Sequence, residues 1–474
     1  MTAEQPPAEQ LPAETLAAFV AIVGEKHALT APDDQAPYLT EWRRLYTGQT
    51  PLVLRPGSTE EVAAIMKLAH ATRTPIVPYG GNTGLVGGQI AHNGEVMVSL
   101  ERLNRVRSVD ARGNTMVAEA GVTLASVQQA AEEAGRLFPL SIASEGTCQI
   151  GGNLATNAGG LQVLSYGNAR ALVLGLEVVL ADGRVWNGLR ALGKDNTGYD
   201  LRDLFIGSEG TLGIITAAVL KLWPRPKSKA TAFIALGSLE DAGRLFEMAH
   251  GMCAGELTAF ELLPRRGMDF VLRHVDGARD PFAEAHPWYA LLEISSQQPD
   301  EAANTTAENM LMAAAEEGAL ADGVLAASLT QAADFWRLRE MMSEVQLHEG
   351  GSIKNDVSVP VADLPEFIRR GMEAVEAVVP GCRPVPFGHY GDGNIHFNIS
   401  QPEGMDKAAF LARWDDVAEA INKLVLEYGG SISAEHGIGY MKRDILPTVK
   451  SDVEMDMMRR IKAALDPEGI LNPG

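Results

Sequence analysis

The sequence has few cysteines and a shortage of basic residues. Its 474 residues include three cysteines, Cys148, Cys253 and Cys382, which lie far apart and form no CxxC pair. This spacing provides neither a disulfide framework nor a thiolate zinc site. Sixty-one acidic residues against 40 basic ones give a formal net charge of −21. A chain this acidic repels phosphate backbones and anionic headgroups, so we expect no nucleic-acid partner.

Long hydrophobic runs are also missing. The longest nearly apolar stretch, ALVLGLEVVLA from Ala171, contains Glu177 and has about half the ~20 residues that a membrane span needs. The N-terminus has no basic start followed by an apolar run, so it does not resemble a secretory signal. Hydrophobic residues make up 46% and charged residues 21%, as in ordinary globular proteins. We therefore expect a cytoplasmic, multi-domain protein without a membrane span.

Glycine is abundant and clustered. The chain has 48 glycines, and they concentrate in residues 80–88, 146–160 and 207–213. Such clusters persist where the backbone needs positive φ or lies against a ligand. The GxGxxG fingerprint is absent, which argues against a Rossmann site, and the Walker-like GLRALGKD of 188–195 ends in Asp195 instead of Ser or Thr. A glycine-rich surface turn remains the alternative for 80–88, but one large ligand explains all three clusters together.

The pattern of elements predicts an α+β protein. Ser58 and Glu61 form a capping-box pattern before a helix, and a strand at 75–79 runs into the first glycine cluster. Long helical patterns follow the segment LWPRPKSKA of 222–230, among them 331–347 and 406–428. We divide the chain into an N-terminal helical segment, a first α+β domain, a second α+β domain and a C-terminal segment that completes the active site, with bounds 1–47, 48–226, 227–430 and 431–474.

Three motifs carry a resemblance to a known family. PYGGNTGLVGG (78–88), SEGTCQIGGNLATNAGG (144–160) and GSEGTLGIIT (207–216), with the closing ILNPG, resemble the FAD-linked oxidase branch of the vanillyl-alcohol oxidase/p-cresol methylhydroxylase flavoproteins. The resemblance implies an FAD-binding α+β domain of the p-cresol methylhydroxylase type and an α+β substrate domain. Residues 79–88 contain no histidine, so the FAD is expected to be noncovalent. The implied cofactor-binding residues are Pro78, Gly80, Gly81, Asn82, Thr83, Gly84, Leu85, Ser144, Gly146, Thr147, Gly151, Asn153, Asn157, Gly159, Gly160, Glu209, Gly213, Ile214 and Asn472.

A second group of polar residues lies in FGHYGDGNIHFNIS (387–400) and SAEHGIG (433–439). Alternation after Gly393 predicts a half-buried strand with His396 and Asn398 on its polar face, and the preceding turn can bring His389 back toward them. Two imidazoles and the carboxylate of Glu435 would suit a catalytic zinc or a similar divalent ion. A hairpin with solvated histidines is the alternative from the residues alone.

These motifs also resemble the D-2-hydroxyacid dehydrogenases of the same family, most closely the D-2-hydroxyglutarate dehydrogenases. The resemblance implies that His389, His396 and Glu435 hold zinc and that His436 is the catalytic base that faces the substrate carbon. Gly437 and Gly439 would let the backbone bend so that the adjacent Glu435 and His436 serve one site. The implied substrate-binding residues are Arg339, Ser343, Lys354, Asn398 and His436.

The proposed substrate clamp departs from the family pattern. Ser343 replaces an expected threonine, and SIKNDVS replaces an aromatic-lined KYD-type sequence, which leaves the choice of 2-hydroxy acid open. Arg339 and Ser343 are spaced i, i+4 and would share one helix face. Without the resemblance, Arg339 would be interpreted as an exposed arginine paired with Glu340 or Glu344.

The implied activity is oxidation of a D-2-hydroxy acid, with D-2-hydroxyglutarate ahead of D-malate, D-lactate and glycolate. No iron–sulfur cysteine pattern is present, so the implied electron acceptor is an electron-transfer flavoprotein or a quinone, and the branch often forms homodimers. A metal hydrolase is one alternative, but it leaves the glycine clusters unexplained. A flavin-binding redox subunit that acts on no hydroxy acid is the other.

Overall fold

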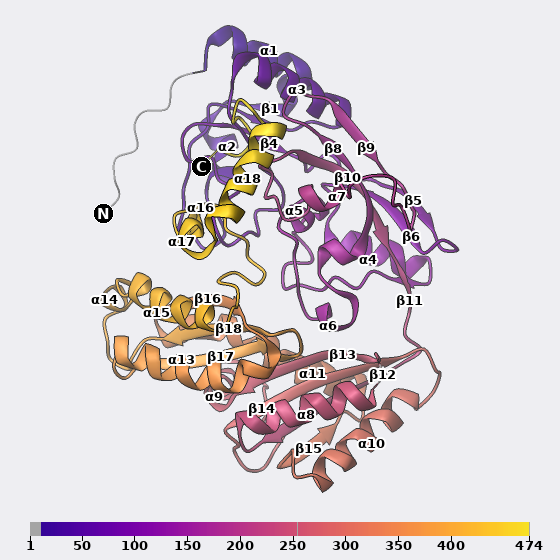
Figure 1. Ribbon diagram of the computed structural model, residues 1–474, viewed down its shortest axis with the longest axis vertical. Coiled ribbons are helices and arrows are strands. Elements are labelled where there is room, and N and C mark those ends of the chain that lie inside the picture. The colour runs from indigo at the N-terminus through magenta and orange to yellow at the C-terminus, as the bar shows by residue number, and fades with distance from the viewer. Residues whose placement is uncertain (1–10, 254, 474) are drawn as a thin grey trace. The chain divides into compact units, whose positions relative to one another are not determined.

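The computed structural model describes residues 11–253 and 255–473 and divides into two compact units. Unit 1 comprises the chain up to Gly159, residues 168–225 and the segment from His436 onward, and unit 2 comprises 160–167 and 226–435. Both units combine helices with sheets, which confirms the predicted α+β class (Figure 1). Residues 1–10 of the predicted N-terminal segment lie outside the described residues. The four-part division remains a prediction.

Unit 1 contains two main sheets. The first has the order β1-β2-β4-β3, with β2, β4 and β3 parallel, and the second is antiparallel with the order β5-β6-β10-β8-β9. The strands of unit 1 are β1 (Ala28–Leu29), β2 (Val53–Leu54), β3 (Ile76–Tyr79), β4 (Val96–Ser99), β5 (Val106–Asp110), β6 (Thr115–Glu119), β7 (Arg136–Leu137), β8 (Val173–Val179), β9 (Val185–Gly188), β10 (Ile214–Lys221) and β11 (Trp223–Pro224). Its helices are α1 (Ala13–Val23), α2 (Pro32–Leu39), α3 (Thr59–Thr72), α4 (Leu124–Glu133), α5 (Ile150–Ala155), α7 (Arg202–Phe205), α16 (Gly439–Lys442), α17 (Leu446–Val449) and α18 (Asp452–Leu465).

The C-terminal segment of the chain is part of unit 1. Ile76 at the start of β3 donates its backbone N–H to Ile470 at 2.8 Å and accepts the N–H of Asn472 at 2.8 Å. The chain end therefore runs beside β3, and β3 is the strand that leads into the first glycine cluster (Figure 1). This pairing brings two motifs that are nearly 400 residues apart in the sequence to one place.

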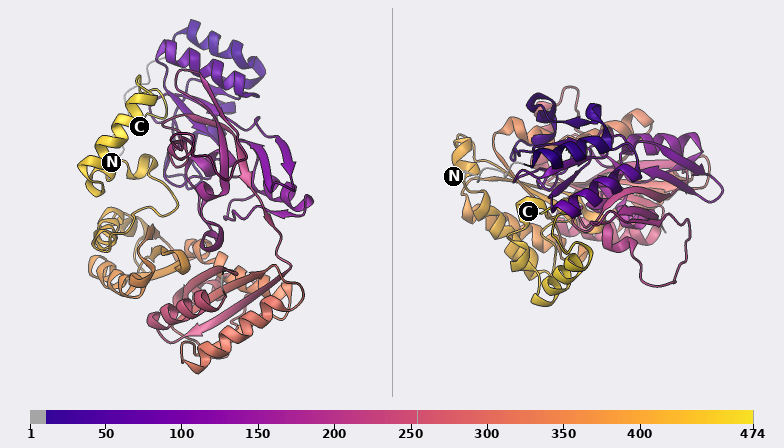
Figure 2. Two further views of the ribbon diagram at one scale, coloured as in Figure 1. Left: turned by 45° about the vertical axis from the view of Figure 1, so that its right-hand side comes forward. Right: turned by 90° about the horizontal axis from the view of Figure 1, so that it is seen from above.

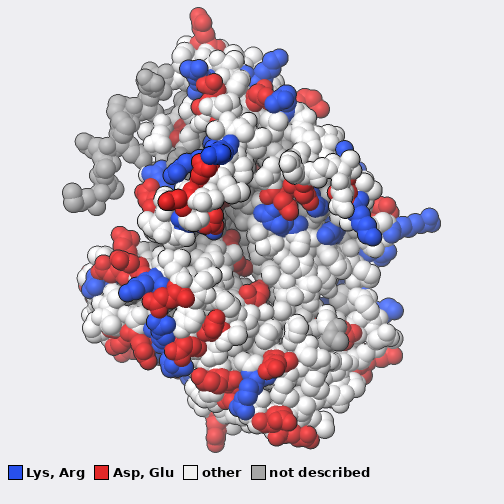
Figure 3. All heavy atoms as spheres, in the orientation of Figure 1, with Lys and Arg blue, Asp and Glu red and all other residues white. Residues whose placement is uncertain are grey.

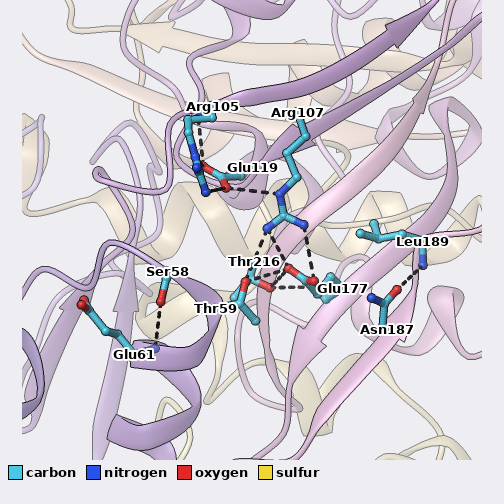
Figure 4. A network of polar contacts seen from close by, with 10 residues as sticks. All are labelled: Ser58, Thr59, Glu61, Arg105, Arg107, Glu119, Glu177, Asn187, Leu189 and Thr216. Atoms are coloured by element: carbon cyan, nitrogen blue, oxygen red, sulfur yellow. Dashed lines mark hydrogen bonds and ion pairs between the residues drawn. The ribbon is translucent and has the colours of Figure 1, made fainter.

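A buried polar network joins the five-stranded sheet of unit 1 to the start of α3 (Figure 4). Glu177, which interrupts the apolar run of β8, accepts hydrogen bonds from Thr59 at 2.7 Å, Thr216 at 2.9 Å and Arg107 at 3.0 Å. Arg107 also donates to the buried Glu119. At the start of α3, Ser58 accepts the N–H of Glu61, as predicted, but Glu61 itself accepts the N–H of Gly57.

Unit 2 is built on one seven-stranded sheet of order β15-β12-β14-β13-β17-β18-β16. The strands are β12 (Ser228–Leu236), β13 (Leu257–Pro264), β14 (Trp288–Ser296), β15 (Asp322–Leu325), β16 (Ser352–Ser358), β17 (Arg383–His389) and β18 (Asn394–Ser400). The helices are α6 (Val163–Tyr166), α8 (Leu239–Met252), α9 (Arg265–His274), α10 (Ala302–Glu316), α11 (Leu329–Glu340), α12 (Met342–Val345), α13 (Leu364–Val378), α14 (Lys407–Leu411) and α15 (Trp414–Glu427).

Helices cover both faces of this sheet. Helices α8, α10, α13 and α15 pack against one face of the sheet (Figure 2). On that face, the ring of Phe397 in β18 contacts the ring of Phe367 in α13. Helices α9, α11 and α12 pack against the other face, around Phe233 and Phe387. The sheet is therefore buried on both sides, and the polar face predicted for β18 is buried as well: Asn398 is 3% exposed.

Two predicted helices are interrupted. The helix predicted over 331–347 divides into α11 and α12 around Met341, and the one predicted over 406–428 divides into α14 and α15 around Arg413. Residue periodicity is the same on both sides of each break, so the sequence pattern could not reveal it.

On the face shown in Figure 3, acidic side chains lie beside basic ones over much of the surface.

Candidate active site

The two predicted histidines lie on neighbouring strands and share one face of the sheet in unit 2. His389 at the end of β17 is paired across the ladder with Glu261 of β13, and His396 of β18 is paired with Asp356 of β16. Directly opposite residues of an antiparallel pair point to the same face. Each imidazole therefore has a carboxylate beside it, and neither carboxylate was predicted as part of the site.

Glu435 reaches the histidines through a short backbone ladder. Ser431 and Ser358 exchange two backbone hydrogen bonds at 2.8 and 3.0 Å, so the chain of 431–435 runs beside the end of β16. The N–H of Glu435 then donates to Asp356 Oδ2 at 2.8 Å. Asp356 thus holds the backbone of one predicted metal ligand while it lies beside another.

The three predicted metal ligands form one cluster. Glu435 Oε1 lies 3.7 Å from His389 Nε2, and Glu435 Oε2 lies 3.9 Å from His396 Nε2. One donor atom from each residue lies within 4.8 Å of the others. Two neutral imidazoles and a carboxylate are a donor set typical of catalytic zinc, so these residues fit the ion that the resemblance implies. The alternative of a hairpin with solvated histidines is wrong for His389, which is buried, while the His396 side chain is 19% exposed.

The electrostatics of the cluster also favour a cation. Burial raises the pKa of Glu435; His389 lowers it, but the Asp356 and Asp392 carboxylates raise it again, and the resulting pKa is about 7. Burial alone lowers the pKa of His389, but the adjacent Glu261 and Glu435 carboxylates raise it to about 9. At neutral pH a protonated His389 therefore supplies positive charge beside these carboxylates, and a divalent ion bound there would supply it in place of that proton.

Arg339 is buried and does not pair with its helix neighbours. It is 6% exposed, donates from Nε to Glu261 Oε2 at 2.5 Å, and places its guanidinium carbon 4.8 Å from the centre of the Phe387 ring. The interpretation as an exposed arginine paired with Glu340 or Glu344 is therefore wrong. A buried guanidinium beside a candidate metal site is suited to binding a substrate carboxylate.

Three further predicted substrate residues, Lys354, Asn398 and Ser343, lie on β16, β18 and α12. Lys354 and Asn398 are cross-strand partners, and Lys354 Nζ donates to Ser343 Oγ at 2.8 Å and to the Ser343 carbonyl at 3.1 Å. The structure thus brings Ser343 and Lys354 together, as the resemblance implies. Because α11 ends at Glu340, Arg339 and Ser343 do not belong to one continuous helix.

The first two glycine clusters pack closely in unit 1. A Cβ added at Gly81 would lie 2.1 Å from the carbonyl oxygen of Thr147, so only glycine fits there. Asn82 adopts a φ of 56° and its amide donates to the carbonyl of Thr40. Close backbone approach at this loop is what a phosphate-binding turn requires. The roles predicted for Thr83, Gly84, Leu85, Ser144, Gly146 and Gly151 remain predictions.

A pocket of about 780 Å³ adjoins these loops. Gly80, Gly81 and Thr147 of the predicted cofactor set line it, together with Gln149. The side-chain oxygen of Gln149 is buried and has no hydrogen-bond partner among the described residues. An orphaned acceptor beside a pocket of ligand size is what a bound cofactor would satisfy, so unit 1 fits a dinucleotide such as FAD.

Several polar residues of the predicted cofactor set already bond to the protein. Asn157 accepts the N–H of Arg170, and the amide of Asn153 donates to Cys148 Sγ at 3.5 Å. The Glu209 carboxylate accepts the N–H groups of Ile438 and Gly439 at 2.8 and 2.7 Å. Asn472 donates to the carbonyls of Gly88 and Glu209. These side chains shape the glycine-rich loops, and direct contact with FAD remains a prediction for them, as it does for Pro78, Gly159, Gly160, Gly213 and Ile214.

The turn after His436 has the bend that the glycines were expected to permit. Gly437 and Gly439 have φ values of 81° and 47°, and Glu209 holds the N–H groups of this turn. His436 is the first residue of the C-terminal part of unit 1, and Glu435 is the last residue of unit 2.

Comparison with known proteins assigns both parts of the chain to a family. Residues 50–188 match the family described as "FAD binding domain", and residues 225–474 match "FAD linked oxidases, C-terminal domain". The chain belongs to the FAD-linked oxidases. It is therefore an FAD-dependent oxidoreductase, and the predicted family and cofactor are confirmed.

Three relatives of this oxidase are named D-2-hydroxyglutarate dehydrogenase. A D-2-hydroxyglutarate dehydrogenase of Xanthomonas citri pv. viticola is 41% identical over 94% of this chain and 93% of its own. The mitochondrial D-2-hydroxyglutarate dehydrogenases of Arabidopsis thaliana and Bos taurus are 38% and 37% identical, over 96% and 100% of this chain and 80% and 86% of theirs.

Solved structures confirm the fold of this oxidase. A p-cresol methylhydroxylase with bound substrate superposes with a TM-score of 0.77 at 16% identity, over 98% of this chain and 97% of its own. An alkyldihydroxyacetonephosphate synthase superposes with a TM-score of 0.75 at 18% identity, over 100% and 86%. Along the described part of the chain, no helix has the length and apolar character that crossing a membrane requires. Because two relatives are named mitochondrial, the cytoplasmic location remains a prediction.

Proposed function

We propose that this oxidase converts a D-2-hydroxy acid, D-2-hydroxyglutarate in the first place, to the 2-oxo acid. The observation that carries the proposal is the cluster of His389, His396 and Glu435 on the same sheet face as Arg339 and Lys354. It combines a divalent-metal donor set with two cationic side chains, which suits a hydroxy acid with two carboxylates. The names of the relatives support the same substrate.

The predicted substrate residues would bind the substrate and remove its hydroxyl proton. Arg339 binds one substrate carboxylate through its planar guanidinium, Lys354 adds a point charge, and Asn398 donates to a substrate oxygen. His436 accepts the hydroxyl proton, since an imidazole is suited to take a proton near neutral pH. Removal of that proton and of the Cα hydride leaves the 2-oxo acid.

His389, His396 and Glu435 would hold the metal ion. A divalent ion held there would supply a Lewis acid that lowers the pKa of the substrate hydroxyl, and FAD held by unit 1 would supply the hydride acceptor. Glu261 and Asp356 flank the two imidazoles, as carboxylates commonly do at zinc sites. We further propose that FAD is bound noncovalently, that the electrons leave to an electron-transfer flavoprotein or a quinone, and that the protein forms a homodimer.

Anaerobic titration with D- and L-2-hydroxyglutarate tests the proposal, with the visible flavin absorption as readout. Bleaching by the D form alone is the expected result. The same titration with D-malate, D-lactate and glycolate ranks the substrates. The ranking is needed because Ser343 and SIKNDVS depart from the family pattern in the substrate clamp and not in the redox chemistry. A yellow protein that no D-2-hydroxy acid bleaches would leave a flavin redox subunit and overturn the proposal.

A further inference from the structure

Glu261 is a buried carboxylate with two unlike partners. It is 1% exposed and lies within the apolar strand LTAFELLP of β13. Its Oε1 lies 2.7 Å from His389 Nδ1, and its Oε2 accepts a hydrogen bond from Arg339 Nε at 2.5 Å. One oxygen therefore meets a predicted metal ligand, and the other meets a predicted substrate-binding cation.

We infer that Glu261 is a positioning residue that ties the metal site to the substrate clamp, an inference that rests on the proposed function. When a metal ion replaces the Nε2 proton of His389, a hydrogen bond from Nδ1–H to Glu261 keeps the remaining proton on Nδ1 and leaves the Nε2 lone pair to the ion. That same Nε2 is the atom nearest to Glu435, at 3.7 Å from its Oε1. Glu261 thus orients His389 toward the cluster without belonging to it.

The bond to Arg339 has a comparable consequence. Glu261 engages Nε, so the two terminal nitrogens remain to bind a carboxylate, and neither has a hydrogen-bond acceptor among the described residues. The Phe387 ring 4.8 Å from the guanidinium carbon restricts the orientation further. Glu261 fixes the Nε of Arg339, and the Phe387 ring lies against the plane of its guanidinium. The two terminal nitrogens are therefore held in a defined direction.

The ladder explains why one residue performs both tasks. Glu261 and His389 are cross-strand partners, while Phe387 lies two residues before His389 and on the same face. A shift of either the imidazole or the guanidinium must therefore move the other through the shared carboxylate. Asp356, the counterpart beside His396, has its Oδ1 3.8 Å from His396 Nδ1 and accepts hydrogen bonds from the backbone N–H of Glu435 and the side-chain amide of Asn394.

The test compares Glu261→Gln with Glu293→Gln in the full FAD-loaded protein. Glu293 is a buried carboxylate of the adjacent strand β14 that pairs with Lys229 and lies outside the cluster, so its substitution controls for the loss of a buried charge. Two quantities are measured: the zinc dissociation constant by chelator competition, and the affinity for 2-oxoglutarate by perturbation of the flavin spectrum in zinc-loaded protein.

We expect Glu261→Gln to weaken zinc binding by about 10–100-fold and 2-oxoglutarate binding by about tenfold, with FAD content unchanged. Glu293→Gln should leave both affinities at the wild-type value. If only one affinity falls, or if Glu293→Gln lowers both equally, the link through Glu261 is wrong. If Glu261→Gln does not fold, Glu261→Asp, which keeps the charge but shortens the reach, should show the same paired loss in smaller measure.

The role of Glu261 and the proposed function can fail independently of each other. Zinc competition needs no turnover, so it reports on Glu261 and His389 even if no D-2-hydroxy acid bleaches the wild-type flavin. Conversely, wild-type bleaching by D-2-hydroxyglutarate with unchanged zinc affinity in Glu261→Gln overturns this inference and leaves the function intact. A wild-type protein that binds no zinc overturns the inference as well.

Discussion

Glu177 of β8 and Arg107 of β5 form an ion pair of 3.0 Å within the five-stranded sheet of unit 1. Burial raises the pKa of Glu177, but hydrogen bonds from Arg107, Thr59 and Thr216 lower it by more than burial raises it. The pKa of Glu177 therefore lies below its ordinary value. We expect Glu177→Gln to destabilise the protein by about 2–3 kcal/mol at pH 7. Chemical denaturation followed by circular dichroism measures this, with the exposed Glu133→Gln as control.

The same pair predicts a pH dependence. A carboxyl group with a lowered pKa stabilises the folded state above its unfolded pKa of about 4.3, and that contribution disappears as the pH falls through the folded pKa. The stability difference between wild type and Glu177→Gln should therefore shrink below about pH 4. A difference that stays constant between pH 7 and pH 3 would show that the charge of Glu177 is not what stabilises the fold.

Gly81→Ala should abolish FAD binding, because the new methyl group would lie 2.1 Å from the Thr147 carbonyl oxygen and separate the two glycine-rich loops. The ratio of flavin to protein absorbance after purification measures the loss. Gly193→Ala is the matched control, since a Cβ there meets no atom within 4 Å. Full FAD content in Gly81→Ala would place the cofactor away from this loop.

Glu209→Ala should loosen the turn that follows His436, because it removes the acceptor for the Ile438 and Gly439 amides. We expect faster hydrogen exchange at these two amides and a kcat lowered about tenfold or more, while Glu209→Gln, which retains an acceptor oxygen, should be milder. Unchanged exchange in Glu209→Ala would contradict the role of this carboxylate in holding the turn.

His436→Ala should slow flavin reduction by D-2-hydroxyglutarate by about 10²–10⁴-fold, the range for loss of a general base. Stopped-flow absorbance under anaerobic conditions measures the rate, and the flavin content should equal that of the wild type. A reduction rate equal to the wild-type rate would remove His436 as the base.

Removal of divalent metal should abolish turnover, and added zinc should restore it. The reason is that His389, His396 and Glu435 form a donor set typical of catalytic zinc. Dialysis against a chelator, followed by metal analysis and assay, measures this effect. His396→Ala should bind zinc weakly and resist restoration. A metal-free preparation with full activity would exclude the metal role.

Short-range patterns predicted the local elements well. The alternation of Ile395, Phe397 and Ile399 with polar residues corresponds to β18, and the strand predicted at 75–79 corresponds to β3. Periodicity alone did not reveal that the polar face of β18 is buried, because the helices that cover it come from distant parts of the chain.

Glu261 and Asp356 were not predicted as part of the site, although a signal for them exists in the sequence. Glu261 interrupts an apolar strand, and Asp356 lies two residues from Lys354 and therefore on the same strand face. A carboxylate inside an apolar strand needs a partner, and the identity of that partner is set by cross-strand register, which is a property of the folded sheet.

The sequence by itself determined the α+β class, the family, the FAD and the residue types of a metal donor set, because glycine clusters and short polar motifs are local and specific. Only the tertiary structure decided which side chains meet. It showed that Glu435 joins the histidines through the edge of β16 and that Arg339 is buried on Glu261. Such contacts depend on strand order and register, and strands that are neighbours in space here are separated by up to about 120 residues of chain.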